Sequence, residues 1–185
     1  MEQKSKKYIL NLAKQAIKHF LFTGEILKID ESELIDKSLA ADGACFVTLT
    51  IFGQLRGCIG HTEAIQPLYL DVIENSIAAA FDDPRFPPLT EEELEKIDIE
   101  VSVLSPAMVL SFSSPEDLLS KIRPNVDGVI LQKGDYAATY LPQVWEQIKS
   151  KEEFLSSLCI KAGLSPDEWQ TKDITVLTYQ VEIIR

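Results

Sequence analysis

The sequence predicts an α+β protein of two lobes, in which helices flank a largely antiparallel sheet. Three observations favour this class. Apolar residues recur at helical spacing in some segments and alternate with polar residues in others. Two pairs of alternating segments are joined by short turns that contain glycine, and helical segments separate the pairs. The 185 residues are expected to form one domain, with a main lobe of about 1–105 plus 171–185 and a smaller lobe of about 106–170 that carries the second hairpin.

The first expected element is an amphipathic helix. Its buried stripe consists of apolar residues spaced by four positions, namely Tyr8, Leu12, Ala16 and Phe20. Gly24 is suited to end this helix, because glycine adopts the left-handed conformation of a C-terminal cap. A short helical segment is expected over residues 32–39.

A hairpin over residues 47–60 follows. Its first strand alternates Val47, Leu49 and Ile51 with threonines. A three-residue turn at 52–54 would place Ile51 opposite Leu55 and Val47 opposite Ile59. This register is expected because a two-residue turn would put a charged residue, Arg56, among aliphatic side chains. Arg56 and Cys58 would then share a face with Thr48 and Thr50.

The rest of the main lobe is expected to contain a helix that opens at Pro67, a capping box at Thr90–Glu93 and a strand at 97–104. In the smaller lobe we expect a short helix from Ser114, a hairpin over 129–141 and a helix between Ser150 and Gly163. Gly134 is suited to the mirror-type turn of that hairpin. The alternating segment 177–183 is expected to return to the main sheet as its last strand.

Composition excludes several classes of function. The chain has 18 basic and 29 acidic residues, and its formal net charge of −11 argues against general nucleic-acid binding. RNA binding through a local cleft is a third, weaker reading, and the same charge counts against it. No apolar run reaches the roughly 18–20 residues of a membrane span, and the polar N-terminus lacks the apolar core of a secretory signal. Three widely spaced cysteines do not suggest a disulfide framework. A reduced, cytoplasmic protein without membrane contact is expected.

The segment Leu55–Gly60 is the first candidate site. Arg56 and Cys58 are two positions apart, and a guanidinium beside a thiol favours the reactive thiolate, so Cys58 is a candidate nucleophile. Gly57 and Gly60 lack side chains and let a ligand, or another backbone, come close. The alternative is structural: strand cysteines are often small buried hydrophobes, and Arg56 can pair with a carboxylate.

Two further residues are candidates for ligand binding. His61 can act as a base or ligand, or can be an ordinary solvated side chain. Arg85, in the proline-rich segment 83–89, can clamp an anion or pair with a neighbouring aspartate. Cys58 and His61 lack a second Cys or His pair at zinc spacing, and no phosphate-binding loop is present, so neither a metal nor a cofactor is expected.

Three segments together resemble one family: Leu55–Gly60 (LRGCIG), Asp83–Leu89 (DPRFPPL) and Thr139–Trp145 (TYLPQVW). The chain resembles the AMMECR domain family, and especially its short prokaryotic members, AmmeMemoRadiSam system protein A. The resemblance runs from about Phe20 to the C-terminus. Arg56 and Cys58 fall on the family's signature positions.

The resemblance implies a two-lobed α+β fold with the signature strand near the cleft between the lobes. It also implies a modification pathway shared with a Memo-like protein and a radical-SAM protein. It supplies no established reaction, so two functions stay open. One is an enzyme or enzyme subunit that binds a small anionic substrate around Arg56, Cys58 and Arg85. The other is a non-catalytic interaction or scaffold subunit.

Overall fold

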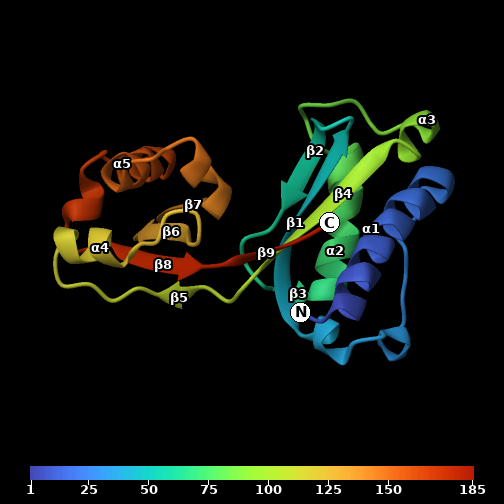
Figure 1. Cartoon of the computed structure of the whole chain (residues 1–185), viewed down its shortest axis with the longest axis horizontal. Coiled ribbons are helices and arrows are strands. Elements are labelled where there is room, and N and C mark those ends of the chain that lie inside the picture. The colour runs from blue at the N-terminus through green and yellow to red at the C-terminus, as the bar shows by residue number, and fades with distance from the viewer. The chain divides into compact units, whose positions relative to one another are not determined.

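The structure, a computed structural model, describes all 185 residues and divides them into two compact units. Unit 1 comprises Met1–Leu104 and Glu182–Arg185, and unit 2 comprises Ser105–Val181. Unit 1 contains a five-stranded sheet and unit 2 a four-stranded sheet, and both are antiparallel (Figure 1). The expected α+β class with two lobes is therefore confirmed. None of the helices combines the length and apolar composition needed to cross a membrane.

Unit 1 begins with a long helix and continues into its sheet. In chain order its elements are α1 (Gln3–Thr23), η1 (Glu31–Glu33), η2 (Lys37–Ala40), β1 (Asp42–Ile51), β2 (Gln54–Gly60), β3 (Gln66–Pro67), α2 (Leu68–Phe81), α3 (Glu91–Leu94), β4 (Ile97–Leu104) and β9 (Val181–Ile184). Gly24, with φ of 71°, caps α1 as expected, and Thr90 and Glu93 form the expected capping box. Pro67 lies one residue earlier than expected, at the N-cap of α2.

One face of the unit 1 sheet packs against α1 and α2. Figure 1 shows both helices alongside this sheet. Cys45, Val47 and Leu49 of β1 are fully buried in a core shared with both helices. The intervening residues of β1 are only partly buried, as alternation along a strand requires. The strand order is β2-β1-β4-β9, with β3 paired to the other end of β1, so β2 is an edge strand.

The turn between β1 and β2 differs from the expected one. It has two residues, Phe52 and Gly53, both with positive φ, so Ile51 pairs with Gln54 and not with Leu55. The register then shifts by one residue, at a bulge next to Arg56, and Val47 pairs with Ile59 as expected. Because of this bulge, a two-residue turn is compatible with the pairing of the aliphatic residues Val47 and Ile59.

Unit 2 has its own sheet and core. In chain order its elements are β5 (Met108–Val109), α4 (Pro115–Lys121), β6 (Gly128–Lys133), β7 (Tyr136–Tyr140), η3 (Pro142–Glu146), α5 (Lys151–Lys161), η4 (Glu168–Gln170) and β8 (Thr175–Tyr179). The strand order is β5-β8-β6-β7. The second hairpin therefore lies in a separate sheet from the first, and Gly134 has the expected positive φ, 56°. In the core, Trp145 and Phe154 stack with ring centroids 3.7 Å apart.

The prediction of one continuous strand over 177–183 in the main sheet is wrong. It consists of two strands, of which β8 belongs to the unit 2 sheet and β9 to the unit 1 sheet. Between them, Gln180 exchanges hydrogen bonds with Ser105. The alternation suggested one continuous buried face, but the residues that are buried, Val176, Tyr179 and Ile184, do not alternate.

Candidate functional site

The residues of the signature strand β2 are held by the proline-rich loop that follows α2. The backbone N–H of Cys58 donates to Asp83 Oδ2 at 2.9 Å, and Arg85 Nη2 donates to the Cys58 carbonyl at 3.1 Å. Because β2 is an edge strand, these two side chains satisfy backbone groups that a further strand would otherwise pair. The loop thus closes the edge of the sheet at Cys58.

Asp83 and Arg85 together form a clamp on β2, and Asp83 makes most of its hydrogen bonds. Asp83 is nearly inaccessible, and its carboxylate also accepts from Arg85 Nε at 2.9 Å and from the Arg85 backbone N–H at 3.1 Å. The Arg85 side chain, together with the backbone N–H groups of Cys58 and Arg85, holds the pKa of the Asp83 carboxyl far below its ordinary value, despite the opposing effect of burial. Asp83 is therefore ionised across the physiological range.

Arg56 is held by Glu93 of α3 and by the carbonyl of Pro87 in the same loop. Its Nε and Nη2 donate to the two carboxylate oxygens of Glu93, at 2.8 and 3.0 Å, and Nη2 also donates to the Pro87 carbonyl at 2.9 Å. The bidentate guanidinium lowers the pKa of Glu93 to about 2, although desolvation opposes this shift. Arg56 itself is buried, its Nη1 has no partner, and its guanidinium lies 5.9 Å from the Phe86 ring centroid.

The bulge changes the expected arrangement of Arg56. Thr48 does pair with Cys58, but Thr50 pairs with Leu55 and not with Arg56. The expectation that Arg56 and Cys58 alternate regularly on the face of both threonines is therefore wrong. The arginine that contacts the Cys58 residue is Arg85, through the carbonyl oxygen.

Cys58 is the only one of the three cysteines that is not fully buried. Its Sγ accepts a hydrogen bond from Thr48 Oγ1 at 3.3 Å, and no basic side chain is hydrogen-bonded to the sulfur. Burial raises the thiol pKa of Cys45, and the nearby Asp71 carboxylate raises it further. Burial also raises the thiol pKa of Cys159. Exposure therefore favours Cys58, while burial disfavours ionisation of the Cys45 and Cys159 thiols.

The two signature glycines are required by close packing within unit 1. A Cβ on Gly57 would lie 2.0 Å from the carbonyl oxygen of Ala79 in α2. A Cβ on Gly60 would lie 2.4 Å from the Phe46 ring and 2.5 Å from the Cys45 carbonyl oxygen. At both positions the close neighbour is therefore the protein's own chain, which accounts for the glycines without a ligand.

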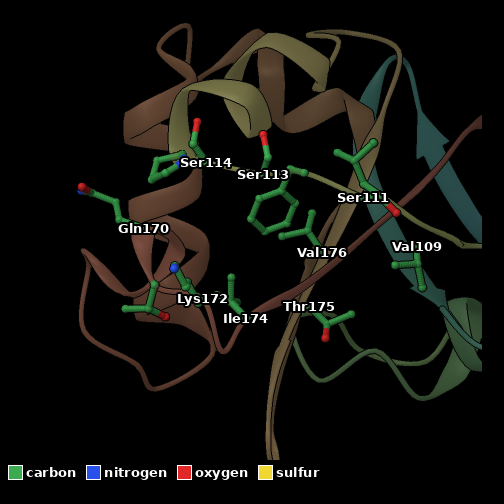
Figure 2. A pocket seen from close by; sticks show the side chains of 13 residues that line it. Val109, Ser111, Ser113, Ser114, Gln170, Lys172, Ile174, Thr175 and Val176 are labelled. Atoms are coloured by element: carbon green, nitrogen blue, oxygen red, sulfur yellow. The ribbon is translucent and has the colours of Figure 1, made fainter.

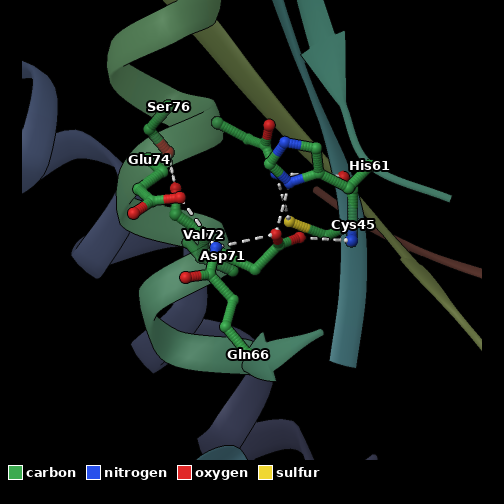
Figure 3. Close-up of polar contacts among 8 residues, drawn as sticks. Cys45, His61, Gln66, Asp71, Val72, Glu74 and Ser76 are labelled. Carbon is green, nitrogen blue, oxygen red and sulfur yellow. Dashed lines mark hydrogen bonds and ion pairs between the residues drawn. The ribbon is translucent and has the colours of Figure 1, made fainter. Parts of the chain in front are cut away.

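His61 belongs to a separate cluster on the α2 side of the sheet. Its Nδ1 lies 2.6 Å from Oδ1 of Asp71, which is completely buried, whereas 44% of the histidine side chain is exposed (Figure 3). Oδ1 also accepts from Gln66 Nε2 at 3.2 Å, and Oδ2 accepts from the Cys45 backbone N–H at 2.8 Å. The Asn75 amide nitrogen lies 3.2 Å from Nδ1.

This geometry defines what His61 can do. In a neutral imidazole, donation from Nδ1–H to Asp71 leaves Nε2 as a proton acceptor. His61 is not positioned as a base for Cys58. Gly57 faces α2, so the next residue, Cys58, faces the opposite side of the sheet, whereas His61 contacts α2. The structure therefore separates the thiol from the imidazole.

Sequence reasoning did not identify Asp71, Asp83, Glu93 or Thr48 as site residues. Asp71 is ten positions from His61 and belongs to no recognisable motif. Asp83 is a neighbouring aspartate of the kind expected to pair with Arg85, and Glu93 belongs to the expected capping box, but their bonds to β2 depend on the fold. The structure brings no three His, Cys, Asp or Glu side chains together as a metal-binding group.

Comparisons with known proteins show the family of this chain. The AMMECR1 family profile matches residues 10–184. Protein MK0488 of Methanopyrus kandleri is 39% identical over 185 residues, covering 96% of this chain and 86% of that protein. A protein of Methanothermobacter thermautotrophicus is 42% identical over 180 residues, covering 95% and 91%. The crystal structure of uncharacterized protein PH0010 from Pyrococcus horikoshii is similar with a TM-score of 0.86 and 36% identity, covering 99% of this chain and 92% of that one. On the sequence match over nearly its whole length, the chain belongs to the AMMECR1 family.

Proposed function

We propose that this protein works in a modification pathway with a Memo-like protein and a radical-SAM protein, and that it binds a small anionic substrate beside Cys58. Family membership supports the pathway, because short prokaryotic AMMECR domain proteins are associated with these two partners. The observation that carries the site is the position of Arg85, whose guanidinium is fixed to the Cys58 carbonyl. Cys58 is the candidate nucleophile of the site.

The charge and exposure of Arg85 suit it to bind an anion. Its side chain is 54% exposed, and its Nε and Nη2 are held by Asp83, so the guanidinium is oriented before a ligand arrives. Nη1 has no protein partner, which leaves donor capacity for a carboxylate or phosphate oxygen. Arg56 is less suited, because it is buried and bonded to Glu93.

The position of Cys58 suits it to react with such a substrate. Its backbone is fixed on both sides by Asp83 and Arg85, and its sulfur is oriented by the Thr48 hydroxyl. Cys58→Ser keeps the size and hydrogen bonding of this side chain and removes its nucleophilicity.

The test is an assay of the three-component system with wild-type protein and with Cys58→Ser. The proposal expects the modified product to disappear with Cys58→Ser. Arg85→Gln, which retains a hydrogen-bonding side chain but removes the charge, is expected to raise the substrate concentration needed for half-maximal activity. Lys149→Gln, an exposed lysine without ion pairs in unit 2, is the matched control and should leave activity unchanged. Full activity of Cys58→Ser would contradict a nucleophilic role.

A non-catalytic docking subunit is the second candidate function. The observation that favours it is that no base is hydrogen-bonded to the Cys58 sulfur, while both candidate arginines, Arg56 and Arg85, are paired with carboxylates. In this case the product would still form with Cys58→Ser, and omission of the whole protein would abolish it. Comparing these two conditions separates the two functions.

A further inference from the structure

Unit 2 contains a pocket that the function proposed for Cys58 does not use. Its volume is about 590 Å³, within the range of small-molecule sites. It lies between the segment 109–115, which leads into α4, and the segment 170–176, which leads into β8. Figure 2 shows Ser113 and Ser114 on one side, with Gln170, Lys172 and Ile174 facing them from the other.

The floor of this pocket is apolar. Val176 and Ile174, which line it, are 0% and 6% exposed and belong to the core of unit 2. Leu110 and Phe112 also line the pocket and pack against the same core. An apolar ring or chain placed against this surface would lose contact with water, which stabilises binding.

The polar part of the lining favours a negative charge. Lys172 is exposed and makes no ion pair or hydrogen bond within the protein. The side chains of Ser111 and Gln170 likewise have no partner there, so all three retain donors for a ligand. No Asp or Glu lines the pocket, although the chain has 29 acidic residues against 18 basic ones. Asp117, near the pocket, is engaged by Ser113 and Lys121.

We infer that this pocket binds a small molecule with an apolar ring or chain and a single anionic group, whose charge pairs with Lys172. The apolar floor would hold the body of the ligand, while the ammonium group and the neighbouring donors would hold the anion. The pocket lies wholly in unit 2, so the inference stands or falls independently of the role of Cys58.

The probe for this site is 1-anilinonaphthalene-8-sulfonate, which joins an aromatic body to one sulfonate and fluoresces when shielded from water. The neutral analogue N-phenyl-1-naphthylamine tests the apolar floor without the charge. The full-length native protein is expected to bind one equivalent of the sulfonate saturably. Lys172→Glu should weaken sulfonate binding about tenfold and leave binding of the neutral analogue unchanged. Ser111→Trp, which fills the pocket from an exposed position, should weaken binding of both probes.

Lys149→Glu makes the same charge change at an exposed unit 2 position that does not line the pocket. It should bind the sulfonate like the wild type. Circular dichroism of each variant establishes that the fold is unchanged. The inference is overturned if the wild type shows no saturable binding, or if Lys172→Glu binds the sulfonate as the wild type does. Equal weakening by Lys149→Glu would overturn it as well, because the effect would then be one of net charge.

Discussion

Among single residues, Asp71 is a fully buried carboxylate that depends on hydrogen bonds from its neighbours. Its two oxygens accept from His61, Gln66 and the Cys45 backbone N–H. Asp71→Asn replaces one acceptor oxygen with an NH₂ donor, so one buried donor then faces another. We expect a loss of about 1–3 kcal/mol in the free energy of unfolding, measured by urea denaturation. Asp98→Asn, at an exposed position of β4, is the control and should change stability little. Equal stability of Asp71→Asn and wild type would contradict the hydrogen bonding described.

The ion pair between Arg56 and Glu93 predicts how stability depends on pH. The folded pKa of Glu93, about 2, is below the value of about 4.3 expected for an unfolded chain. Its stabilising contribution is therefore complete above about pH 4.3 and is lost as the pH falls toward 2. Glu93→Gln should have a smaller loss of stability between pH 5 and pH 2.5 than the wild type, as measured by urea denaturation at each pH. Parallel curves for the two proteins would show that this pair contributes nothing.

Among the secondary-structure elements, β2 is expected to have a backbone protected from hydrogen exchange by its bonds to Asp83 and Arg85. Asp83→Ala removes the acceptor of the Cys58 N–H and releases Arg85. We expect hydrogen exchange to accelerate by an order of magnitude or more at the Cys58 amide, measured by mass spectrometry of peptides covering 54–60. Asp135→Ala, in the exposed turn between β6 and β7, is the matched control. Unchanged exchange at Cys58 would mean that the loop does not protect the edge.

The packing of β2 on α2 makes a second prediction at this scale. Gly57→Ala would place a methyl group 2.0 Å from the Ala79 carbonyl oxygen, so the strand and helix must move apart. Overpacking of this kind costs about 1–3 kcal/mol, which thermal or urea unfolding would detect. Gly53→Asn lies in the turn, where nothing is within 4 Å and Asn tolerates positive φ. It should cost much less, and a comparable loss in both variants would refute the packing argument.

Sequence patterns predicted the elements well where local chemistry decides them. Gly24, the capping box at Thr90 and the turn at Gly134 are examples, because each depends on the preferences of a few neighbouring residues. The bulge beside Arg56 was not predictable, since an extra residue in one strand depends on its pairing with another strand. The buried polar side of α2 was missed for the same reason: only the folded chain shows that Asp71 meets His61.

At the scale of the whole molecule, the two units have separate hydrophobic cores. Both tryptophans, Trp145 and Trp169, belong to unit 2, so tryptophan fluorescence reports the unfolding of that unit. We expect Gly57→Ala to lower the unfolding midpoint seen by far-ultraviolet circular dichroism more than the midpoint seen by fluorescence. Coincident shifts in the two signals would mean that the chain unfolds as one cooperative body.

The assignment of the last strand also failed at this scale. The segment 177–183 alternates well enough for one strand, but the strand is interrupted at Gln180 and the chain passes from unit 2 to unit 1 after Val181. Periodicity detects a strand and not the sheet to which it belongs, so the two sheets that share this segment could not be separated from the sequence.

We propose that Cys58, in the edge strand β2, is the reactive thiol of this protein. The direct measurement is brief treatment of the native protein with iodoacetamide, in which the thiolate sulfur bonds to the reagent's carbon and iodide leaves. Peptide mass spectrometry then locates the label among the three cysteines. Cys58 is only partly buried, whereas Cys45 and Cys159 are buried and burial raises their thiol pKa values. We therefore expect Cys58 to be labelled first, and Cys58→Ser to leave the native protein unlabelled over the same time. Labelling of Cys45 or Cys159 before Cys58 would contradict this account and would favour the docking function.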